Sequence, residues 1–149
     1  MTTTESIVEA CRKVLDQWNG AWLSAVYLYG SILGKRRRSD SNVDIAVLDR
    51  LYGRLSWSEQ SRLMDELERA VGQPVDLRML RDCTLSQQIH VFDEGLPMWA
   101  EGGDELADYV RATKLRFEAD REHMRKTGAL TLRTLAQRLA NTNESAISR

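Results

Sequence analysis

The chain has 149 residues, of which 42% are hydrophobic, so it is long enough for one domain with a substantial core. Its formal net charge of −1 provides no global field for nucleic acid or acidic membranes. We find no apolar run long enough to span a bilayer, and the polar start MTTTESIVEA does not resemble a signal peptide. Two isolated cysteines, Cys11 and Cys83, fit no metal or redox spacing and suit a reducing cytosol. We therefore expect a cytoplasmic protein with no membrane association and no direct nucleic-acid binding.

The first elements in chain order are a helix and a strand. Apolar residues at helical spacing predict a helix over 4–18, capped by Thr2 with Glu5 and ended by Asn19-Gly20. The run AVYLY at 25–29 is rich in β-forming residues and stops at a glycine. This pattern predicts a short buried strand.

A polar, basic stretch separates this strand from the next one. Residues 31–42 predict a loop or a short helical turn, and VDIAVL at 43–48 predicts the second strand. Because strand side chains alternate, the strand has two distinct faces. One face carries Val43, Ile45 and Val47, and the other carries Asn42, Asp44, Ala46 and Leu48.

Two capped helices enclose a third strand. Ser56 and Glu59 form a capping-box pattern for a helix over 57–71. The segment VDLRML at 75–80 predicts a strand. A second capping-box pattern, TLSQ, begins a helix expected over 85–94.

The carboxyl-terminal third predicts an edge strand and two helices. Residues 97–101 resemble a short strand, which the proline at its start restricts to a sheet edge. A long helix over 104–126 is expected to break at Gly128 before a last helix over 129–140.

This order of elements predicts an α/β (α+β) fold with a small mixed sheet of about four strands and packed helices. We expect the helices to cover one face of the sheet and the acidic edge to stay open on the other. A single domain is expected over 1–140, followed by a polar, disordered tail over 141–149.

The most informative residues are Gly30 and Ser31, at the end of the first strand, with Asp44 and Asp76 on the next two strands. A Gly-Ser turn can bring backbone amides and a hydroxyl close to phosphates. Carboxylates on neighbouring strands can share a divalent metal, and magnesium prefers such oxygen ligands. Nucleotidyl transfer requires this combination, because its main needs are a positioned triphosphate and charge neutralisation.

Gly30-Ser31, ten intervening residues and then Asn42-x-Asp44 resemble the Gly-Ser…Asp-x-Asp motif of the DNA polymerase β-like nucleotidyltransferases. The small size resembles the minimal nucleotidyltransferase (MNT) branch, the antitoxins of the MntA type. Val75-Asp76-Leu77 resembles its third acidic strand, and CTLSQQIHVFDEGLPMWAE resembles its following helix and edge strand. The resemblance covers roughly residues 20–125.

The resemblance implies a polymerase β-like fold and an antitoxin that forms a hetero-oligomer with a HEPN-family ribonuclease toxin encoded beside it. The implied reaction is metal-dependent transfer of AMP from ATP to a tyrosine of the toxin, with Mg²⁺ and ATP as cofactors. By the same resemblance Gly30 and Ser31 would hold phosphates, and Asp44 would bind metal. Asp76 would bind the catalytic metal and help deprotonate the acceptor tyrosine, and Asn42 would stand at the remaining ligand position.

The sequence departs from this family pattern in two places. Lys35 stands where the family usually has a glycine, and Gly34 lies one residue earlier. Asn42 stands where the family has its first aspartate, so one neutral carbonyl oxygen replaces a carboxylate. Loss of one preorganised charge can cost on the order of a hundredfold in rate. Asp40 is a nearby substitute, but it lies in the turn before the strand register begins.

Each of these candidate site residues also has a purely structural explanation. Asp44 and Asp76 could be neutralised by salt bridges to Arg78 or Arg81, because a buried unpaired carboxylate is costly. The basic run Lys35–Arg38 could contact a triphosphate, a partner or only solvent. His90 is expected on a helix surface.

Three functions remain open at this point. The first is a protein adenylyltransferase that acts on the toxin tyrosine. The second is an inactive relative that neutralises the toxin by binding alone, which Asn42 motivates. The third is a nucleotidyltransferase for small molecules of the aminoglycoside type, although the chain is short for a second substrate domain.

Overall fold

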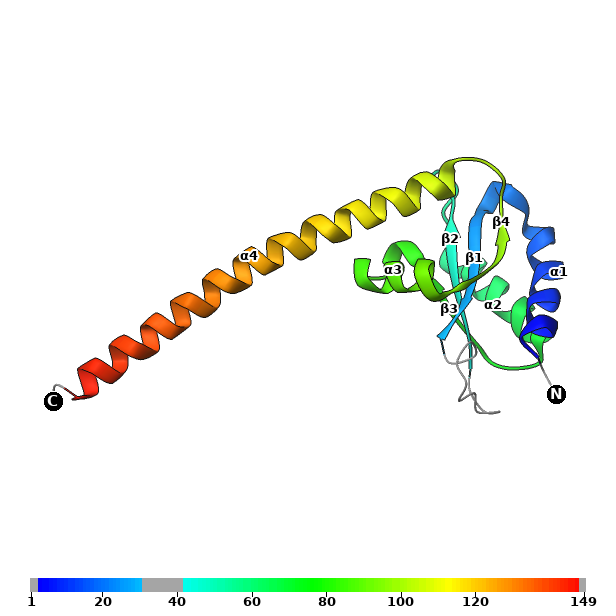
Figure 1. Ribbon diagram of the computed structural model, residues 1–149. Coiled ribbons are helices and arrows are strands. Elements are labelled where there is room, and N and C mark those ends of the chain that lie inside the picture. Colours follow the sequence, from blue (N-terminus) through cyan, green and yellow to red (C-terminus); the bar gives the residue numbers. More distant parts are fainter. Residues whose placement is uncertain (1–2, 31–41, 148–149) are drawn as a thin grey trace. The chain divides into compact units, whose positions relative to one another are not determined.

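The computed structural model describes residues 3–30 and 42–147. In this part of the chain the elements follow the order α1, β1, β2, α2, β3, η2, α3, β4 and α4 (Figure 1). Ser31, the basic run Lys35–Arg38 and Asp40 lie outside the described residues. The predicted 31–42 loop lies outside them as well, except for its last residue.

The first helix, α1 (Thr4–Trp22), is longer than the sequence pattern predicts. Its capping box joins Thr3 and Ser6, so the prediction of Thr2 with Glu5 was wrong. The helix also continues through Asn19-Gly20, where we expected it to end. The indole Nε1 of Trp18, in the last turns, donates a 2.6 Å hydrogen bond to Glu66. Packing of this kind outweighs the roughly 1 kcal/mol per residue that a glycine costs inside a helix.

The sheet has four strands, as predicted, and it is mixed. The strands are β1 (Leu23–Tyr29), β2 (Val43–Asp49), β3 (Val75–Met79) and β4 (Leu96–Ala100). Their spatial order is β3-β2-β1-β4, so β4 is an edge strand as expected. The β1–β2 and β1–β4 pairs are antiparallel and the β2–β3 pair is parallel.

The two capped helices form where the sequence predicts them. They are α2 (Trp57–Val71) and α3 (Leu85–Glu94), and Ser56 and Thr84 complete their capping boxes. The third strand is one residue shorter than expected, because the chain enters a short 3₁₀ turn, η2 (Leu80–Asp82).

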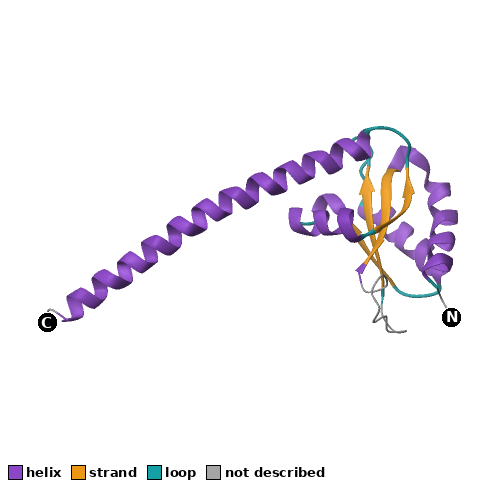
Figure 2. Cartoon of the chain, in the orientation of Figure 1, coloured by secondary structure: helices purple, strands orange, loops and turns teal. Residues whose placement is uncertain are grey.

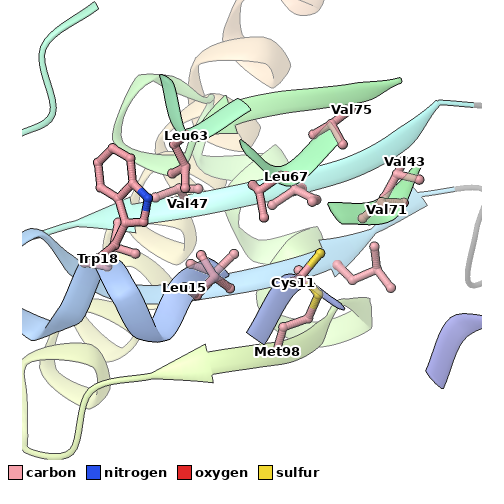
Figure 3. Close-up of a cluster of buried hydrophobic side chains, with 14 of the residues drawn as sticks. Cys11, Leu15, Trp18, Val43, Val47, Leu63, Leu67, Val71, Val75 and Met98 are labelled. Atoms are coloured by element: carbon pink, nitrogen blue, oxygen red, sulfur yellow. The ribbon is translucent and has the colours of Figure 1, made fainter. Parts of the chain in front are cut away.

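The larger core lies between one face of the sheet and the helices α1 and α2 (Figure 3). It includes the predicted face of β2, with Val43, Ile45 and Val47 fully buried. Cys11 lies inside this core, and burial raises the pKa of its thiol to about 12. The thiol is therefore structural and unreactive.

The opposite face of the sheet is only partly open. A second cluster packs against it, formed by Ala25, Tyr27, Ala46, Leu48, Leu80 and Val91, with Phe92, Leu106 and Tyr109 beside them. The α3 helix therefore covers part of the face that we expected to be free, and the expectation of helices on one face alone was wrong. Figure 2 shows helices on both sides of the sheet. Tyr29 also packs against this cluster, and Asp44 on the neighbouring strand is half-buried.

The last helix, α4 (Glu105–Ile147), is continuous, so the predicted break at Gly128 was wrong (Figure 2). It includes residues 141–147, which we had assigned to a polar tail. The chain divides into two compact units, Met1–Thr113 and Lys114–Arg149. The expected domain bounds remain a prediction. Within the described residues, no helix combines the length and the apolar character that a membrane crossing needs.

Candidate active site

The sheet register brings the two acidic residues together. Asp44 on β2 is the direct partner of Asp76 on the parallel strand β3. On the other side, Asp44 is the antiparallel partner of Tyr29, the last residue of β1. Adjacent strands lie about 4.8 Å apart, so the two carboxylates emerge side by side from one face. The sequence prediction that the two aspartates share a site is consistent with this pairing.

The environment of Asp44 makes its negative charge costly. The pKa of its carboxyl is raised from the ordinary 3.8, first by burial and then by the charge of Asp76, while Arg78 acts in the opposite direction. Among the described residues, no ion pair to Asp44 is found. A carboxylate of this kind, beside a second one, has the properties expected of a ligand for a divalent cation.

Tyr29 on β1, Asp44 on β2 and Asp76 on β3 form a row across three neighbouring strands. Burial raises the pKa of the Tyr29 phenol to about 12, the charge of Arg78 acts in the opposite direction, and the charges of Asp44 and Asp76 add to the increase. The hydroxyl therefore stays protonated at neutral pH and presents a neutral donor beside the acidic pair.

Gly30 follows Tyr29 and lies directly against Asp44. Its φ of 79° is in the left-handed region. A Cβ atom at this position would collide with Oδ2 of Asp44 and approach its Cγ to 3.0 Å. Backbone conformation and close approach therefore both require glycine.

Gly30→Ala is expected to reduce stability and disturb the position of Asp44. The left-handed conformation alone costs about 1–2 kcal/mol for a residue with a Cβ. Gly72→Ala is the matched control, because Gly72 has a φ of 76° and nothing within 4 Å of the added atom. Urea denaturation of both variants measures the difference. An equal loss in both would show that the Asp44 contact adds nothing.

The structural alternative of a salt bridge is confirmed for Asp76, which pairs with Arg78, but the described residues give Asp44 no such partner. Arg81 binds the buried Asp49, with Nε 3.1 Å from Oδ1. Arg78 contacts Asp76, with Nε 3.6 Å from Oδ2, and both side chains are about half exposed. The pKa of Arg78 is raised, chiefly by Tyr29 and Asp76. Arg78 is therefore a cation at the edge of the acidic pair.

A cavity of about 220 Å³ opens beside Asp44. Part of its lining comes from α3, which sequence reasoning did not connect with the site. The sequence does place Gln87, His90 and Val91 on one side of a predicted helix. It does not show which strand that side of the helix faces. His90 is exposed on α3, as predicted, and also lines this cavity. The full lining consists of Tyr29, Asp44, Ala46, Arg78, Cys83, Gln87, His90 and Val91.

Asn42 lies exposed immediately before β2, two residues from Asp44. Its neutral side chain leaves the described part of the site with two carboxylates. Accordingly, the described residues contain no group of three acidic, histidine or cysteine side chains placed to hold a metal. Carboxylate oxygens are the donors that a divalent cation prefers, so Asp44 and Asp76 are the described residues that would hold one.

The family model described as "Polymerase beta, Nucleotidyltransferase" matches residues 11–100, which include Gly30, Asp44 and Asp76. A comparison with curated proteins gave no match. Several solved structures match this chain over most of its length. A crystal structure of a toxin–antitoxin with AMP-PNP contains a chain 22% identical to this one, with a TM-score of 0.65. The match covers 79% of this chain and 92% of that chain.

Two further structures have the same fold. A chain of the toxin–antitoxin MntA–HepT is 20% identical, with a TM-score of 0.62, over 82% of this chain and 93% of that one. A chain in the complex of a tri-AMPylated Shewanella oneidensis HEPN toxin with an MNT antitoxin is 21% identical, with a TM-score of 0.61. That match covers 80% of this chain and 90% of the other. Since the family model covers more than half of the sequence, the chain belongs to the polymerase β nucleotidyltransferase family.

Proposed function

We propose that this chain is an antitoxin that transfers AMP from ATP to a tyrosine of a HEPN-family ribonuclease toxin encoded beside it. The observation that carries this proposal is the register pairing of Asp44 with Asp76, with Gly30 packed against Asp44. Family membership supports nucleotidyl transfer in general. The similar structures support this acceptor, because one of them contains a tri-AMPylated toxin bound to its antitoxin.

Each of the site residues would have its own role in such a transfer. Asp44 and Asp76 would hold a Mg²⁺ ion, which would offset the negative charge of the phosphates. Gly30 would let the backbone approach the phosphates, with Ser31 supplying its hydroxyl. In the transfer, the phenol oxygen of the acceptor bonds to the α-phosphorus and the bond to pyrophosphate breaks. The phenolic proton passes to the carboxylate of Asp76, and pyrophosphate leaves.

Intact-mass spectrometry of the toxin tests this proposal. The toxin is incubated with the full chain, ATP and Mg²⁺, with an Asp44→Ala/Asp76→Ala double variant in parallel. We expect one or more AMP units on the toxin with the natural chain and none with the double variant. A toxin that stays unmodified although it forms a stable complex with the natural chain would contradict AMP transfer.

Neutralisation by binding alone is a second candidate, which the neutral side chain of Asn42 favours. In that case the double variant should still protect cells from the toxin. Loss of protection in the double variant, with the complex still formed, would exclude it.

Arg78→Gln is expected to tighten metal binding in the absence of nucleotide. The guanidinium lies beside Asp76 and opposes a second cation there. Exposed charge pairs contribute up to about 1 kcal/mol, so we expect the Kd for Mn²⁺ to fall about twofold to fivefold. Calorimetric titration with Mn²⁺ measures this change. Arg69→Gln, an exposed arginine on α2, is the control, and an equal change in both variants would exclude a local effect of Arg78.

A further inference from the structure

The second unit of the chain exposes large apolar side chains. Its described residues, 114–147, form only the helix α4, so the unit itself offers nothing to cover them. Leu132, Leu135 and Leu139 are 70%, 48% and 65% exposed. Their spacing of three and four residues places them on one side of a helix. These three residues are called the leucine stripe below.

Covering the leucine stripe would be strongly favourable. Full burial of one leucine side chain contributes about 1.5–3 kcal/mol. Contiguous exposed apolar surface of this kind usually marks an interaction site. Ala136 and Ala140 are small neighbours on the same helix, and they allow another backbone to approach closely.

The charge around the stripe indicates what kind of surface covers it. Between residues 123 and 143 the chain has four basic residues and no acidic one. The basic residues are Arg125, Lys126, Arg133 and Arg138. Glu122, just outside this stretch, lies 3.7 Å from Lys126. Glu144 ends this stretch on the other side. By helical spacing Arg138 lies beside the stripe and Arg125 lies on the same side two turns earlier, so the edge of the stripe is basic and complementary to an acidic partner.

A second copy of the chain fits poorly. Pairing two stripes, in either direction, brings Arg138 of both copies to the edge of the contact, and the stretch 123–143 offers no carboxylate to pair with them. A membrane surface also fits less well. The stripe is narrow, and no aromatic residue follows Phe117, whereas membrane-surface helices usually carry a broad apolar face with aromatic anchors.

We propose that the leucine stripe docks into an acidic-rimmed apolar groove between helices of the toxin. This inference rests on the proposed function, because it names the surface by which the chain holds its acceptor protein. Three leucines at helical spacing are the anchors of a helix-in-groove contact, and the surrounding arginines contact the acidic rim. Docking raises the local concentration of the acceptor at the catalytic unit. It therefore lowers the KM for the toxin and leaves kcat unchanged.

The test compares the natural full chain with a Leu132→Gln/Leu135→Gln/Leu139→Gln variant. Glutamine keeps a high helix propensity, and circular dichroism checks that the helix persists. Leu115→Gln is the matched control, because Leu115 is 61% exposed in the same unit but lies on the other side of the helix. Calorimetry measures the Kd for the toxin, and mass spectrometry measures KM and kcat for AMP transfer.

We expect the triple variant to bind the toxin at least thirtyfold more weakly, with a raised KM and an unchanged kcat. The Leu115→Gln control should stay within about threefold of the natural chain. An Arg125→Glu/Arg138→Glu variant should also bind more weakly, and less so at high salt.

Three results would overturn the docking proposal. The first is unchanged toxin affinity in the triple variant. The second is a dimer of the isolated chain that only the triple variant dissociates, as seen by light scattering. The third is binding to vesicles of anionic phospholipid that the triple variant loses while toxin affinity is kept. The proposed function fails separately, when the natural chain binds the toxin through the stripe but transfers no AMP.

Discussion

Asn42→Asp is expected to raise the rate of AMP transfer to the toxin by about tenfold to a hundredfold, and to tighten Mn²⁺ binding. The change restores a carboxylate two residues before Asp44, at the start of the same strand. It adds a charged oxygen ligand to a site whose described part has two carboxylates. Preorganised charges of this kind affect rates by about two orders of magnitude in other enzymes.

Two measurements separate the causes of this gain. Calorimetry with Mn²⁺ reports metal affinity directly, and intact-mass spectrometry of the toxin reports transfer. Asn42→Ala is the control, because it removes the amide without adding charge and should reduce both quantities. If Asn42→Asp tightens the metal but transfers no faster, the amide at position 42 does not limit the reaction. If neither quantity changes, position 42 is not part of the site.

Much of the first unit, Met1–Thr113, could be predicted from local pattern. Alternation along 43–48 correctly separated the buried Val43 from the acidic Asp44. Ser56 and Thr84 form the predicted capping boxes because their signals lie within four residues. The sequence placed Asp44 and Asp76 on two strands, and the structure adds that these strands are neighbours in which the two residues are direct partners.

Some errors came where distant contacts outweigh local preference, and others where a local cost was too small. Asn19-Gly20 and Gly128 each carry a local cost of about 1 kcal/mol or less, which did not end either helix. The placement of α3 over the second face of the sheet depends on packing between Tyr27, Phe92 and Tyr109. No periodicity in the sequence specifies which face a helix covers. The cavity beside Asp44 could not be predicted for the same reason.

Asp49 illustrates what sequence reasoning missed within β2 itself. Its carboxylate is buried, binds Arg81, and accepts a 3.0 Å hydrogen bond from the backbone of Leu55. A strand with two aspartates five residues apart offers no signal of which one is structural. The interaction partners of each carboxylate distinguish the two residues. Asp49 has both a cation and a backbone donor, whereas Asp44 faces another carboxylate.

Asp44→Asn and Asp49→Asn are therefore expected to have opposite effects. Asp44→Asn should lower AMP transfer by about a hundredfold to a thousandfold, because it would remove one of the two carboxylates that we propose to hold the metal. It should also stabilise the metal-free protein by a few tenths to about 1 kcal/mol, since like charges on neighbouring strands are destabilising. Asp49→Asn should destabilise the fold by about 2–3 kcal/mol, because Arg81 loses its buried partner.

The pH dependence of stability is the most direct test of the effect predicted for Asp44→Asn. The pKa of Asp44 is raised in the folded protein, so ionisation of this carboxyl costs stability as the pH rises through the folded pKa. The higher stability of the Asp44→Asn variant should therefore be present at neutral pH. It should disappear below the ordinary carboxyl pKa, where Asp44 of the natural chain is protonated and is as neutral as the asparagine. Urea denaturation of metal-free protein at several pH values measures it, with mass spectrometry of the toxin for transfer. A protein that Asp44→Asn destabilises at neutral pH would show that Asp44 has a structural partner, and the acidic pair would then not be a cation site.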